Sequence, residues 1–117
     1  MTTQISPNLI QTDIVTFNIQ FTLPAGSDDT YTLLQNASFG FTIDKAYYQT
    51  TTGSITGNVK IEAVSVTGLS ALSITTTPTT TSASALNTVA IGDKITLVTT
   101  SNVSGVMVSV CLECTKA

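Results

Sequence analysis

The sequence predicts an all-β fold, namely an antiparallel β-sandwich or jelly roll of about seven or eight short strands. Threonine is the commonest residue, at 24 of 117, and with valine and isoleucine it supplies β-branched side chains that suit a pleated, half-buried surface. Apolar and polar side chains alternate with a period of two in several segments, whereas no segment has a helical period. Turn residues such as Gly, Pro, Asn and Asp recur about every 8 to 14 residues, which fits many short strands.

The chain is expected to form one domain preceded by an arm. Its 117 residues suffice for a single core but not for two. Residues 1–12 show neither the period of two that is typical of a strand nor a helical period, and they carry the isolated apolar side chains Ile5, Leu9 and Ile10. We therefore expect an extended N-terminal arm over 1–12, followed by a single β-sandwich domain over 13–117. The arm is either disordered or ordered only against a neighbour, and its three apolar side chains favour docking.

The strands are placed by the alternation and by the turns between them. The strictest alternation runs over 14–22, where every second residue is apolar. Polar stretches over 50–57 and 75–81, which contain glycines or a proline, are expected to be loops. The remaining strands are expected around Tyr31 and Leu33, over 39–48, over 58–66, over 82–87, around Ile95 and Leu97, and over 106–114, with Val106, Val108, Val110, Leu112 and Cys114 facing inward.

The composition argues against an enzyme. The chain has no His, so it lacks the side chain that most often serves as a general base or as a zinc ligand near neutral pH. Its seven acidic residues are scattered over turns and outward strand positions, which favours solvated roles over a catalytic pair. We expect no catalytic residue, no cofactor and no metal site.

The charge pattern and the hydropathy argue against two classes of partner. The four lysines are spread along the chain and form no basic patch for a phosphate backbone, so we expect no nucleic-acid binding. No apolar run approaches the ~20 residues that span a bilayer, and the N-terminus lacks a signal-peptide pattern. We expect a protein that is made in the cytoplasm and does not enter a membrane.

Two pairs of side chains have a structural and a functional interpretation. Cys111 and Cys114 form a C-x-x-C spacing, but residues three apart on a strand point to opposite faces, so we expect two reduced thiols. Tyr47 and Tyr48 either form a platform for sugar rings or place one ring in the core and one at an interface. We favour the second interpretation of the tyrosines.

The middle and the end of the chain contain the stretches FTIDKAYYQTTTGSITGNVKIEAVSVTGLSALSITTTP and SALNTVAIGDKITLVTT. These stretches resemble β-sandwich modules of tailed-bacteriophage structural proteins, including head-decoration, cement and fibre components. The resemblance extends over about Ala37 to Cys114 and lies in strand rhythm and in short runs such as GLSALSITTTP and VAIGDKITLV. It implies a virion protein in many copies, a homotrimer bound to other virion proteins. The late cysteines and the arm have no counterpart in that family.

The composition and the resemblance together favour a capsid cement or decoration protein on the capsid exterior, assembled in the host cytoplasm. In this hypothesis the protein binds the major capsid protein and stabilises the shell, and a trimer gains avidity by engaging several shell sites at once. The arm residues Ile5, Leu9 and Ile10 are the expected anchors, and Thr79, in the loop over 75–81, is expected at the rim of the contact.

The alternative function is a tail-fibre or receptor-recognition module that binds host surface glycan. Tyr48, beside Tyr47, and the Thr-rich loops are the candidate contacts, because a ring for stacking beside neutral polar groups suits a sugar. The chain has no Trp and only 6% aromatic residues, which makes this alternative the weaker of the two.

Overall fold

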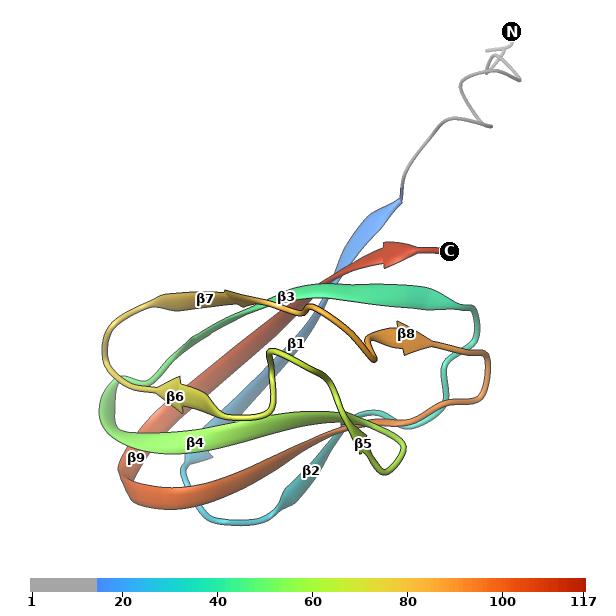
Figure 1. Ribbon diagram of the computed structural model, residues 1–117. Helices are drawn as coiled ribbons and strands as arrows, with labels where there is room; N and C mark the ends of the chain where they lie inside the picture. Colours follow the sequence, from blue (N-terminus) through green and yellow to red (C-terminus); the bar gives the residue numbers. More distant parts are fainter. Residues whose placement is uncertain (1–14) are drawn as a thin grey trace, which may run out of the picture.

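The computed structural model describes residues 15–117, so the predicted arm over 1–12, with Ile5, Leu9 and Ile10, lies outside the described residues. Every regular element in the described part is a β-strand, which confirms the all-β prediction (Figure 1). The strands are β1 (Thr16–Ala25), β2 (Thr30–Leu34), β3 (Phe41–Gln49), β4 (Thr52–Ile61), β5 (Val64–Ser65), β6 (Leu72–Ile74), β7 (Thr79–Ser82), β8 (Thr88–Val89) and β9 (Ile95–Lys116).

The long strand β9 contributes to both layers of the fold because it bends near its middle. Its first half, from Ile95, pairs with β4 on one edge and with β2 on the other. Its second half, up to Lys116, pairs with β3 and with β1. All four pairings are antiparallel, so β9 is the central strand of each layer.

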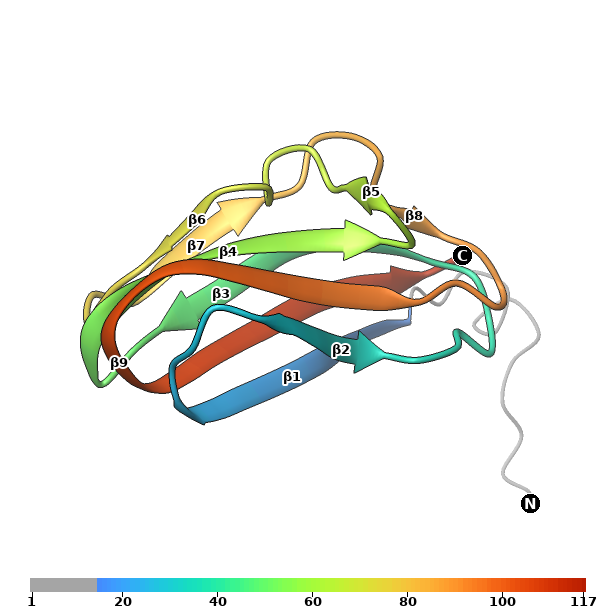
Figure 2. The ribbon, with the colours of Figure 1, turned by 90° about the horizontal axis from the view of Figure 1, so that it is seen from below.

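The two layers have the strand order of a jelly roll. One layer runs β2, first half of β9, β4, β6, and the other runs β1, second half of β9, β3, β7. The pairs β1 with β2, β3 with β4, and β6 with β7 are each divided between the layers, and their bends lie at the same end as the bend of β9 (Figures 1 and 2). In each of these pairs one strand lies in one layer and the next strand lies in the other, with the core between them, as in double-sheet jelly rolls.

The core lies between the two layers. An aromatic cluster of Phe17, Phe39 and Phe41 is part of it, with ring centroids 5.0 to 5.8 Å apart in edge-on and tilted orientations that aromatic pairs prefer. The largest fully buried side chains are those of Phe41, Ile43, Ile55, Leu69, Leu72, Ile74, Ile95, Leu97, Leu112, Val59, Val66 and Val89.

A bulge in β3 decides which tyrosine faces the core. The pairing of β3 with β9 shifts just after Ile43. Phe41 and Ile43 are buried before the shift, whereas Ala46 and Tyr48 are buried after it. Because the extra residue reverses the phase of the alternation, Tyr48 points inward, and without the bulge Tyr47 would take that place.

Two glycines that suggested a loop lie within β4, so the prediction of a loop over 50–57 holds for 50 and 51 and is wrong for 52–57. Gly57 occupies an inward position, where an added Cβ would lie 3.1 Å from Leu97 Cδ1 and 3.2 Å from Ile74 Cδ1. Gly53 has a φ of +73°, and an added Cβ there would lie 2.2 Å from a carbonyl oxygen of β9. Both glycines therefore mark close approach of β4 to other strands rather than a chain reversal.

Two further predictions are corrected around β7. The expected loop over 75–81 is only partly a loop, because Thr79–Ser82 pairs with the edge of β3. The strand expected over 82–87 extends no further than Ser82, and between Ser82 and β8 the chain makes a single bridge, from Ala85 to Thr67. Thr has high β propensity, so a run of hydroxyl side chains forms an exposed edge strand as readily as a loop.

The inward position predicted for Val106 is also wrong, since this side chain is 42% exposed. The bend of β9 contains Ser104 and Met107, both at a φ of 53°. Residues with a positive φ interrupt the regular pleat of a strand, so the alternation that buries Val108 does not extend back to Val106.

We predict that Gly57→Val lowers the free energy of unfolding by about 1 to 3 kcal/mol, because its side chain would overpack the space beside Leu97 and Ile74. Urea unfolding followed by circular dichroism measures the change. Gly40→Ala is the matched control, because an added Cβ there meets its nearest neighbour at 3.5 Å. Equal stability of the two variants would contradict the inward position of Gly57.

Candidate functional site

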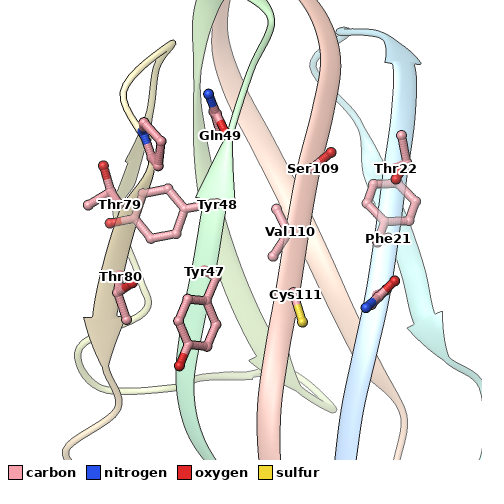
Figure 3. A pocket seen from close by; sticks show the side chains of 12 residues that line it. Phe21, Thr22, Tyr47, Tyr48, Gln49, Thr79, Thr80, Ser109, Val110 and Cys111 are labelled. Atoms are coloured by element: carbon pink, nitrogen blue, oxygen red, sulfur yellow. The ribbon is translucent and has the colours of Figure 1, made fainter.

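A groove of about 320 Å³ crosses the outer face of the layer formed by β1, β9, β3 and β7 (Figure 3). All four strands or their ends contribute to it. None of its lining residues is charged, so the groove offers neutral hydroxyl, amide and aromatic groups. The lining consists of Gln20, Phe21, Thr22, Tyr47, Tyr48, Gln49, Pro78, Thr79, Thr80, Ser109, Val110 and Cys111.

The antiparallel register aligns the outward side chains of the groove in rows that run across the strands. Residues that are paired between neighbouring strands point to the same face, and successive rows are two residues apart along each strand. The two rows are Gln20, Cys111, Tyr47 and Thr80, followed by Thr22, Ser109 and Gln49.

Tyr47 is the exposed aromatic ring of the groove, and its side chain is 40% exposed. Its hydroxyl donates a hydrogen bond to Glu113 Oε2 at 3.4 Å. Gln49, in the next row, donates a hydrogen bond from Nε2 to the carbonyl oxygen of Thr76 at 3.0 Å. These bonds hold both side chains against the sheet, so the groove has a defined shape.

A pair of opposite charges bounds the groove on the side of Tyr47. Lys45 and Glu113 are paired across β3 and β9, and Lys45 Nζ lies 3.9 Å from Glu113 Oε1. Both side chains are partly exposed, so this ion pair contributes little to stability. Because the two opposite charges compensate each other, the ion pair adds no net charge beside the uncharged groove.

The structure separates the two neighbouring tyrosines. Tyr48, the predicted contact residue, is only 6% exposed, and its hydroxyl lies 2.6 Å from Thr81 Oγ1 on β7. Its ring is part of the core, and Tyr47 supplies the exposed ring instead. The structure therefore places one ring in the core and one on the surface, and the bulge in β3 makes Tyr47 the outward one.

Thr79 and Val15, the first described residue, lie at opposite ends of the same layer. Thr79 pairs with Tyr48 near the bends, and its hydroxyl donates a hydrogen bond to the carbonyl oxygen of Thr77 at 3.0 Å. At the other end, the carbonyl oxygen of Val15 accepts a hydrogen bond from the backbone of Lys116 at 2.8 Å. The structure therefore brings Thr79 to the groove, at the far end of the layer from the point where residues 1–14 join it.

Cys111 and Cys114 are both free, and they lie on opposite faces as predicted. Cys111 is half-buried in the groove, whereas Cys114 is buried in the core. Burial raises the pKa of Cys114 to about 12, and the nearby charge of Asp44 adds to the effect. Burial also raises the pKa of Cys111, together with the charge of Glu113. Both thiols are therefore protonated at neutral pH.

Exposed apolar side chains gather at both ends of the jelly roll. Val103, Val106 and Met107 are exposed at the bend of β9. At the other end, Val64 and Leu86 line a hollow of about 510 Å³, and Leu86 has a φ of 53°. Sequence reasoning missed both patches, because they lie at bends and turns where the period of two does not hold.

Within residues 15–117, no group of three or more His, Cys, Asp or Glu side chains is arranged to hold a metal ion. The described part of the chain also contains no helix that is long and apolar enough to cross a membrane. The neutral groove and the apolar ends are the surface features that remain as candidate contacts.

No family model and no curated protein matches this chain. Among solved structures, it is similar to a chain in a structure of infectious bursal disease virus, Gx strain, with a TM-score of 0.47 and 15% sequence identity. The similarity covers 89% of this chain and 32% of the viral chain, so this chain spans about a third of that chain's length. No residue of this chain takes a role from this likeness.

We predict that the buried thiol of Cys114 makes stability fall in alkaline solution. The unfolded chain loses this proton near the ordinary pKa of 9.0, whereas the folded protein keeps it up to about 12. Between these values the unfolded state binds fewer protons, so the free energy of unfolding decreases as the pH rises.

Urea unfolding at neutral pH and near pH 10 measures this dependence, with Cys114→Ala as the comparison. The variant is less stable at both pH values because it leaves a small cavity, but its loss of stability between them should be smaller than in the unsubstituted protein. An identical pH dependence in both proteins would show that Cys114 ionises as readily in the folded state as in the unfolded one.

Proposed function

We propose that this chain is a structural protein of a virus particle, specifically a cement or decoration protein that binds the outer capsid shell in many copies. The observation that carries the proposal is the uncharged, hydroxyl-rich groove on the outer face of a jelly-roll layer. Double-sheet jelly rolls are a frequent architecture of viral capsid domains. The resemblance of residues 37–114 to modules of tailed-bacteriophage structural proteins also supports a role in a virus particle.

Desolvation explains why such a face suits a contact between proteins. Only 9% of the residues in the chain are charged, and the groove lining has no charged side chain. Neutral hydroxyl and amide groups cost less to remove from water than charged groups do. A contact made in many copies can also be weak at each site and remain strong as a whole.

In this proposal the major capsid protein is the main partner, and assembly takes place in the host cytoplasm. The arm over 1–12 supplies Ile5, Leu9 and Ile10 as apolar anchors, and Thr79 lies at the rim of the uncharged face.

We predict that replacing Ile5, Leu9 and Ile10 together by Ser lowers the amount of protein bound to purified capsids at least about tenfold. Burial of three aliphatic side chains contributes several kcal/mol to a contact, and about 1.4 kcal/mol corresponds to a tenfold change in affinity. The measurement is the copy number of this chain relative to the major capsid protein after sedimentation of the particles.

The matched control replaces Gln4, Asn8 and Gln11 together by Ser, which changes as many positions of the arm without removing apolar surface. Its copy number should equal that of the unsubstituted protein. Full binding by the apolar variant would remove the arm from the proposal. Absence of this chain from the purified particle would remove the proposed function itself.

A second candidate function is binding of host surface glycan, as in a tail-fibre or receptor-recognition module. The observation that favours it is the exposed ring of Tyr47, fixed by Glu113 and flanked by the amides and hydroxyls of the two groove rows. At about 320 Å³, the groove is at the lower end of the size range of small-molecule sites. An uncharged groove with one exposed ring fits a neutral saccharide better than a charged ligand.

We predict that Tyr47→Ala removes saturable binding on a glycan array, with at least a tenfold loss of affinity, because ring contacts contribute about 0.5 to 1.5 kcal/mol beyond their buried area. Tyr47→Phe keeps the ring and loses only the hydroxyl, so it should bind within about threefold of the unsubstituted protein. The absence of any saturable glycan signal from the unsubstituted protein would exclude this function for the groove.

A further inference from the structure

The strand β1 has one edge without a partner among the described strands. Through its other edge it pairs with β9 from Thr16 to Ala25. It has ten residues, whereas the strands at the other margins of the two layers are shorter: β2 has five, β7 has four and β6 has three. Figure 2 shows β1 at the margin of the molecule, with β9 on one side. Short edge strands limit pairing with other chains, and β1 is not short.

The usual protections of an edge strand are also missing from most of β1. Its sequence, TFNIQFTLPA, contains no charged residue, and the four lysines of the chain all lie elsewhere. Pro24 stands near the end of the strand, which leaves 16–23 unprotected. A long, uncharged edge of this kind favours the addition of another strand.

The backbone groups that face the open edge can be assigned from the ladder with β9. The carbonyl oxygen of Val15 accepts a hydrogen bond from Lys116, so odd-numbered residues of β1 direct their N–H and C=O groups towards β9. Even-numbered residues therefore direct theirs outward. The outward residues before Pro24 are Thr16, Asn18, Gln20 and Thr22.

The inward side chains of β1 are also incompletely covered. Phe17, Ile19 and Phe21 are only partly buried, although they pack against the core. The residues paired with Ile19 and Phe21 on β9, Leu112 and Val110, are 0% and 1% exposed. A strand added to the open edge would complete the burial of this row.

The geometry points to a second copy of this chain as the occupant, with the two β1 strands antiparallel about a two-fold axis through Ile19. In this register Phe17 lies opposite Phe21 of the other copy, and Asn18 lies opposite Gln20. All outward residues before Pro24 then find a partner, which gives about eight interchain hydrogen bonds. A register shifted by one pair towards the C-terminus would place an outward residue opposite Pro24, which has no N–H group.

A second copy fits this edge better than an unrelated strand for two reasons. The pattern of β1 is self-complementary about Ile19, with aromatic side chains opposite aromatic ones and amides opposite amides. Because the strand is uncharged, two identical copies meet without like-charge repulsion. The contact is isologous and closes as a dimer, in contrast to the trimer that the resemblance implies, which needs two different surfaces on each subunit.

The test introduces charged side chains at the exposed positions 18 and 20, and the oligomeric state of the full chain is then measured by sedimentation velocity and native mass spectrometry. Asn18→Lys with Gln20→Lys places like charges opposite each other and should raise the dimer dissociation constant at least tenfold. Asn18→Lys with Gln20→Glu places opposite charges there and should keep the dimer. Both side chains are exposed, and thermal unfolding of each variant checks that the subunit still folds.

A dimer that the first variant dissociates and the second retains supports both the pairing and its register. If both variants dissociate to the same extent, the register centred on Ile19 is overturned, because a register centred on Asn18 would place lysines opposite each other in both. A monomer at a protein concentration of about 100 µM, or a trimer that neither variant disturbs, overturns the β1 contact altogether.

Discussion

The pairing of β9 on both edges, in both layers, is the constraint on which the rest of this fold depends. The bend that carries β9 from one layer to the other is hydrogen-bonded to the turn between β1 and β2. Asn102 donates a hydrogen bond from Nδ2 to the carbonyl oxygen of Gly26 at 3.0 Å and accepts one at Oδ1 from Gly105 at 3.1 Å. Asp28 accepts a hydrogen bond from the backbone of Asn102 at 2.9 Å. Two chain reversals distant in sequence are thus held as one unit.

The groove follows from the same register. Once β1, β9, β3 and β7 are aligned, their outward side chains must form rows, and the chemistry of the face depends only on which residues occupy them. The bulge after Ile43 then selects Tyr47 for the surface and Tyr48 for the core. A single extra residue therefore determines which of the two tyrosine rings the groove exposes.

A strand and the direction of its side chains can be predicted from the sequence where one face of the strand is buried and the other is exposed to solvent. The alternation over 14–22 identifies β1 for this reason, and the opposite faces of Cys111 and Cys114 follow from the same period. Prediction fails where a residue is chosen for the space available to it, because Gly57 in a packed strand looks like a glycine in a loop. The choice between Tyr47 and Tyr48 could not be predicted either, since a bulge leaves no composition signal.

The position of β9 in the sequence has a consequence for synthesis. Strands β1 to β8 are made before the strand that pairs with four of them, so neither layer can close until residues 95–116 have left the ribosome. During that interval β1 has two unpaired edges and no charge to keep other chains away. Nascent chains on one messenger are therefore exposed to mispairing with one another until the final segment has been made.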